Sequence, residues 1–134
     1  HHFSLVLERR TTVHEGVFLL EELDSGGGDG GGGQSPATIR QTGILGEIGG
    51  GRYSTPVMDG IVPAGVATVT LQFPATRHGN RRLPPLSATG DVVNDVFAIR
   101  IPTLFERGGW PADAIWRSAS GEIAKTINER PFHP

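Results

Sequence analysis

Several short segments of the chain alternate hydrophobic and polar residues with a period of two, which predicts β-strands with one buried face. The clearest is residues 66–73, where Val69, Leu71 and Phe73 share one face and polar residues fill the other. Pro74 follows and ends the strand, because proline has no backbone N–H to donate to a neighbouring strand. This segment predicts one sheet face packed against a core.

Weaker patterns of the same kind recur along the chain. Strands are predicted at residues 3–8, 52–58, 96–101, 114–117 and 122–127. Pro56 favours an edge position for the second of these segments. Asn94 and Asp95 predict a tight turn or bulge, and Gly121 supplies the left-handed residue of a terminal hairpin. The expected core between two sheets is Val69, Leu71, Phe73, Phe97, Ile99, Ile101, Trp116 and Ile123.

Two segments carry helix signals. Residues 12–23 begin with a capping box, but Gly16 interrupts the pattern and the apolar run 17–20 suits a buried strand. Strand is the favoured interpretation there, with helix as the alternative. Ser35 as N-cap, followed by a proline, and Gly43 as C-cap predict one short helix between them.

Glycine and proline divide these elements, with 20 Gly and 10 Pro in 134 residues. We predict a mobile Gly-rich loop at 24–34, a polar basic loop at 75–85 and a frayed tail at 128–134. The length suits one domain, 1–134. The predicted fold is mainly β: an immunoglobulin-like antiparallel β-sandwich of about five to seven strands with one short helix.

Charge and composition narrow the classes of partner. The net charge is −2 and the pI is about 6.2, whereas nucleic-acid modules usually carry a basic face, so no nucleic acid is expected. The chain has no cysteine, which excludes disulfides and Cys-ligated metals. No apolar run reaches 18 residues, so no membrane-spanning segment is expected. The His-His-Phe start indicates either a removed leader or upstream domain, or remnants of a tag.

No set of residues predicts catalysis. The glycine run lacks the Lys and Ser/Thr of a phosphate-binding loop, and no G-x-S-x-G motif is present. The histidines lack the close spacing of zinc ligands, and the acidic pairs fit turns and strand ends. We therefore expect no enzyme activity, no cofactor and no metal site.

Two places could bind a ligand. Arg77, His78, Arg81 and Arg82 crowd positive charge into one loop, which suits a phosphate or an anionic glycan. Trp110 lies between glycine and proline in an irregular segment and could stack on a sugar. The alternatives are a solvated loop tip for the basic residues and simple packing for the tryptophan, and these are the commoner roles for such residues.

Three stretches resemble a known domain. They are residues 60–71 (GIVPAGVATVTL), 93–97 (VNDVF) and 115–122 (IWRSASGE), about half of the chain. Together they are similar to a domain of unknown function that recurs in secreted or surface proteins of high-GC actinobacteria. The resemblance implies an immunoglobulin-like sandwich and an extracytoplasmic location. The chain departs from that pattern near its N-terminal strand, where the domain often carries cysteines.

Two functions stay open. The first is a non-enzymatic structural or interaction domain of an exported protein. The alternative is a carbohydrate- or anionic-polymer-binding module that uses the 77–82 loop and Trp110. The expected partner is another protein or a cell-surface glycan, and the sequence gives no oligomeric state.

Overall fold

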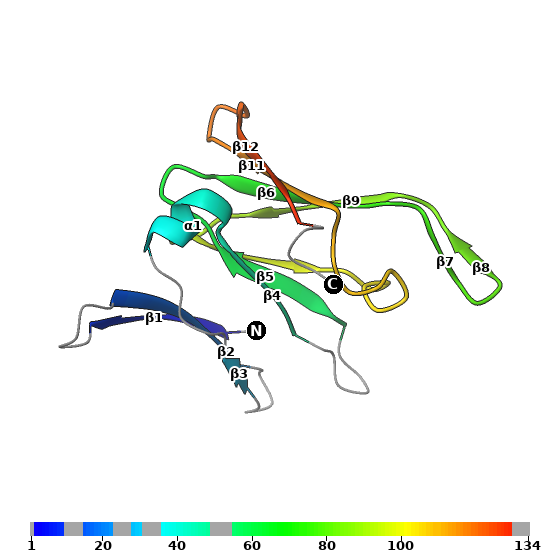
Figure 1. Cartoon of the computed structure of the whole chain (residues 1–134), viewed down its shortest axis with the longest axis horizontal. Coiled ribbons are helices and arrows are strands. Elements are labelled where there is room, and N and C mark those ends of the chain that lie inside the picture. Colours follow the sequence, from blue (N-terminus) through cyan, green and yellow to red (C-terminus); the bar gives the residue numbers. More distant parts are fainter. Residues whose placement is uncertain (1, 10–14, 23–27, 31–35, 49–54, 130–134) are drawn as a thin grey trace.

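The computed structural model describes residues 2–9, 15–22, 28–30, 36–48 and 55–129 (Figure 1). These residues form antiparallel sheets and one short helix, so the chain is mainly β as predicted. One sheet has the order β10-β5-β4 and another the order β12-β11-β6-β9. The strands of the first are β4 (Ile44–Ile48), β5 (Val57–Ile61) and β10 (Val96–Arg100). Those of the second are β6 (Thr68–Phe73), β9 (Leu86–Asp91), β11 (Asp113–Arg117) and β12 (Ile123–Asn128).

These two sheets enclose the core and make the fold a β-sandwich. The three-stranded sheet contributes Met58, Phe97 and Ile99, and the four-stranded sheet contributes alternate residues of β6 and β11 together with Ile127 of β12. The buried cluster holds Met58, Val62, Val66, Val69, Leu71, Phe73, Phe97, Ile99, Ile101, Leu104, Ala114, Trp116 and Ile127. The period-two pattern therefore identified the inward faces of β6 and β10 correctly.

One predicted core residue, Ile123, is wrong, since its side chain is 59% exposed. A bulge between Trp116 and Arg117 shifts the pairing with β12, so that Ile123 lies opposite Arg117. Partners in an antiparallel pair share a face, and Arg117 lies on the outer face. Ile127, which pairs with Ala114, is the β12 residue that enters the core.

The strand predicted at residues 52–58 is also corrected. β5 begins directly after Pro56 and lies at the centre of its sheet, not at an edge. It extends to Ile61, and residues 52–54 of the predicted strand lie outside the described part of the chain. β4 was not predicted, because Gly46 breaks the alternation in that short segment. Pro56 is compatible with a central strand since it precedes the first paired residue.

Residues 75–85 form a hairpin instead of an irregular loop. β7 (Thr76–His78) pairs with β8 (Arg81–Leu83), and the hairpin continues the ribbon made by β6 and β9. β9 itself was not predicted. Prolines lie between β6 and β7 on one side and between β8 and β9 on the other, so the ladder of hydrogen bonds is interrupted there. Beyond them the hairpin projects from the sandwich (Figure 1).

The N-terminal part forms a separate sheet of order β1-β2-β3. Its strands are β1 (His2–Arg9), β2 (Glu15–Glu22) and β3 (Gly28–Gly30), which confirms strand over helix in the ambiguous segment. Gly28–Gly30 pairs with β2, which corrects the prediction of a loop at that point. The rest of the predicted Gly-rich loop lies outside the described residues.

The predicted helix is confirmed as α1 (Pro36–Thr42). It ends at Gly43, whose φ of +68° is the left-handed conformation expected of a C-cap. Ile39 of α1 packs with Ile61 on the outer side of the β5 sheet. Two predicted turns are also confirmed: Asn94 and Asp95 have φ of 52° and 64°, and Gly121 has φ of 88°. Positive φ at two consecutive residues suits a two-residue β-turn of the kind that joins antiparallel strands.

Candidate functional site

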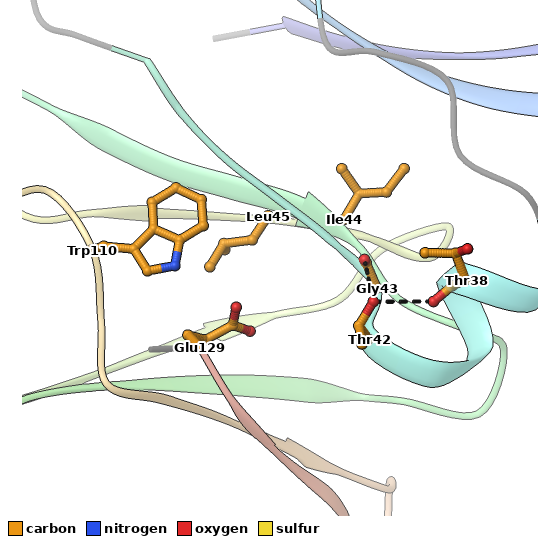
Figure 2. A pocket seen from close by; sticks show the side chains of 7 residues that line it. All are labelled: Thr38, Thr42, Gly43, Ile44, Leu45, Trp110 and Glu129. Carbon is orange, nitrogen blue, oxygen red and sulfur yellow. Dashed lines mark hydrogen bonds between the residues drawn. The ribbon is translucent and has the colours of Figure 1, made fainter. Parts of the chain in front are cut away.

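A pocket of about 350 Å³ opens between the edge strands of the two packed sheets (Figure 2). One wall comes from α1 and the start of β4, and the other from the segment before β11 and the residue after β12. Its lining residues are Thr38, Thr42, Gly43, Ile44, Leu45, Trp110 and Glu129. Among the described strands, β4 and β12 are the last of their sheets on that side, and the pocket lies between them.

Glu129 is the charged residue of the lining, and it is nearly buried, with 6% of its surface exposed. Its backbone N–H donates to the Ala112 carbonyl at 2.9 Å, which fixes the residue against the segment before β11. Burial raises the pKa of its carboxyl to about 7, because removal from water penalises the charged form. A hydrogen bond from the Trp110 side chain opposes this pKa shift, and the negative charge of Asp113 adds to it.

Trp110 is half-buried and turned toward Glu129 (Figure 2). The turn before it is closed by a hydrogen bond from the Gly109 N–H to the Leu104 carbonyl, at 2.9 Å. Arg107 braces the same segment, since its guanidinium donates to the Thr103 hydroxyl and the Pro84 carbonyl, both at 2.7 Å. The indole is therefore held by a fixed loop.

The helix side of the pocket is braced as well. The Thr42 hydroxyl is placed to donate to the Thr38 carbonyl at 3.2 Å or to the Gly43 carbonyl at 3.3 Å (Figure 2). The Lys125 ammonium donates to the Gln41 carbonyl at the end of α1 and lies 6.0 Å from the Trp116 ring centre. A cation at the C-terminal end of a helix complements the carbonyls there. The hydrogen bond from Lys125 to Gln41 therefore connects β12 to α1, and the pocket opens between these two elements.

The predicted basic residues lie elsewhere. Arg77, His78, Arg81 and Arg82 are all exposed on the β7–β8 hairpin, and none of them lines the pocket. The structure therefore does not bring them around one concavity with Trp110. Arg77 pairs directly with Arg82, and His78 with Arg81. Each face of the hairpin thus carries a pair of basic side chains, and within the described ranges no acidic side chain forms an ion pair with them.

Glu129 was not predicted as a site residue. The segment 128–134 was predicted to fray, whereas Asn128 ends β12 and Glu129 is buried. Residues 130–134 lie outside the described part. A lone glutamate near the end of the chain gives no signal, because its burial depends on a loop and a helix that are distant in sequence.

Other kinds of site find little support in the part of the chain that the structure describes. It contains no group of three or more His, Asp or Glu side chains able to hold a metal ion. None of its helices has the length and hydrophobicity needed to cross a bilayer. In comparisons with protein-family models, curated proteins and solved structures, nothing matched the chain. The resemblance to actinobacterial exported domains therefore stays a prediction.

Proposed function

We propose that this protein is a non-enzymatic interaction domain of an exported protein, built on an immunoglobulin-like sandwich, which binds an anionic glycan through the β7–β8 hairpin. The observation that carries the proposal is the register of that hairpin, in which Arg77 lies opposite Arg82 and His78 opposite Arg81. Export and the immunoglobulin-like class rest on the resemblance of the sequence motifs.

The register matters because the Cβ atoms of directly opposite residues on a sheet lie only about 5 Å apart. Like charges at that distance destabilise a hairpin. Here the basic pairs are exposed on a projecting hairpin, and no described carboxylate offsets them. A polymer with repeated carboxylate or sulfate groups would relieve this repulsion, and guanidinium groups bind such oxyanions in bidentate fashion.

An anionic glycan fits better than a nucleic acid. The hairpin contains no Phe, Tyr or Trp on which a base could stack. The positive charge is also confined to one hairpin in a chain of net charge −2, whereas nucleic-acid domains usually spread it over a face. A glycan chain needs only a local row of cations.

The test is binding to heparin as a model anionic glycan, measured by calorimetry at 50 mM and 200 mM salt. The Arg77→Gln/Arg82→Gln variant is expected to bind heparin at least about tenfold more weakly. The slope of its log affinity against log salt concentration should be smaller by about two, because about two fewer counterions are released. Arg40→Gln/Arg100→Gln is the matched control, because both of these arginines are exposed outside the hairpin.

The hairpin variant should fold as well as the wild type, since it removes a like-charge pair. Equal heparin affinity in the two double variants would contradict the proposal. Tighter binding of duplex DNA than of heparin, under the same salt, would replace the glycan with a nucleic acid.

A further inference from the structure

We propose that the pocket between α1, β4 and the end of β12 is a binding site for an alkylammonium group, with the Glu129 carboxylate as its counter-ion. The site is separate from the basic hairpin and does not depend on the function proposed above. The ligand is a primary amine on a short aliphatic chain, either free or as a lysine side chain.

Charge gives the first reason. Among the seven lining residues the only ionisable side chain is the acidic Glu129. Asp113 on β11 adds negative potential at Glu129. The ammonium of Lys125 on β12 is engaged by the Gln41 carbonyl and lies 6.0 Å from the Trp116 ring centre. A cationic ligand would supply the counter-charge that the lining residues do not.

Shape and lining chemistry give the second reason. Leu45 and Ile44 offer aliphatic contacts, and the Trp110 indole offers a ring that favours cations near its face. Thr38 and Thr42 bring oxygen atoms to the same pocket, which can accept from an ammonium. A volume of about 350 Å³ lies within the usual range of small-ligand sites. An amine with about four carbons matches this mixture of apolar and acceptor groups.

The state of the carboxyl is consistent with this assignment. Its pKa is raised to about 7, mainly by burial, so the carboxylate lacks full compensation in the free protein. An ammonium ion would stabilise the charged form and bring that pKa down. Binding should therefore strengthen as the pH rises through about 7, by about tenfold between pH 6 and pH 8.

The experiment is an NMR titration of the whole chain with n-butylammonium, followed at the indole N–H of Trp110. Uncharged n-butanol and anionic butyrate are the comparison ligands. Millimolar binding of the amine is expected, with n-butanol and butyrate at least about tenfold weaker. Glu129→Gln should weaken the amine at least tenfold, and Glu122→Gln, which removes an exposed carboxylate from the last hairpin, should not.

Equal affinity for n-butanol, or unchanged amine binding in Glu129→Gln, would overturn the proposal. If Glu129→Gln does not fold, the pH series on the wild type decides, and binding that does not strengthen between pH 6 and pH 8 would equally refute it. A capped lysine peptide separates the two sources. Tighter binding of this peptide than of n-butylammonium supports the site with a protein lysine as its ligand, and weaker binding supports it with a free amine.

Discussion

Glu129→Gln should make the protein more stable at alkaline pH without changing it much in acid. The wild-type carboxyl has a pKa of about 7 in the fold against 4.5 as its ordinary value. The folded state therefore binds more protons than the unfolded state between these values, and stability falls as the pH rises from about 4.5 to about 7. Glutamine cannot ionise, so the variant escapes this loss.

The size of the effect follows from the pKa difference. The pKa in the fold exceeds the ordinary value by about 2.5. Because each pKa unit corresponds to about 1.36 kcal/mol, ionisation of Glu129 lowers the free energy of unfolding by about 3 kcal/mol. Because the pocket opens to solvent, screening lowers this to about 2 kcal/mol. The difference in unfolding free energy, variant minus wild type, should thus rise by about 2 kcal/mol between pH 5 and pH 8.

Urea unfolding of both proteins across that pH range measures this difference directly. A change of about 2 kcal/mol moves the midpoint by about 1 M urea for a domain of this size. Glu122→Gln serves as control for the loss of one negative charge. A difference between Glu129→Gln and wild type that stays flat from pH 5 to pH 8 would refute the assignment of a desolvated carboxyl to the pocket.

Three further changes test the fold. Gly60→Ala should cost at least about 3 kcal/mol in urea unfolding, because a Cβ there clashes with the carbonyl oxygen of the adjacent strand and lies 2.7 Å from the ring of Phe97. A loss below about 1 kcal/mol would mean that β4 and the Phe97 ring can move away from Gly60 within their sheet, and would contradict this close packing. Asp95→Gly should stabilise by about 0.5 kcal/mol, since glycine adopts the positive φ of 64° without strain, and a lower midpoint would argue against that turn. Lys125→Met should lower the free energy of unfolding by about 1 kcal/mol, because it removes the hydrogen bond from the ammonium to the end of α1. An unchanged melting temperature would refute that role.

Local pattern was sufficient for elements whose environment is set by their own residues. The alternation in β6 and β10 gave their buried faces, and Gly121 and Asn94 marked turns that form where expected. The short helix followed from its cap residues. In each case the determining interaction lies within a few residues of the signal.

Position within a sheet could not be predicted in this way. β5 looked like an edge strand because of Pro56, yet β4 and β10 pair on its two sides. Ile123 looked buried because the bulge that turns it outward depends on pairing with β11. A strand's partners are chosen by the whole sheet, and the strand's own sequence does not encode them.

The candidate sites show the same division. The sequence alone established a mainly β chain without cysteine, the cluster of basic residues at 77–82 and the isolation of Trp110 between glycine and proline. Only the tertiary structure placed Arg77 opposite Arg82, and only it buried Glu129 beside Trp110 and α1. Register and burial depend on residues far apart in the chain, so the charges that a site holds, and the pKa of its carboxyl, emerge only when those residues meet.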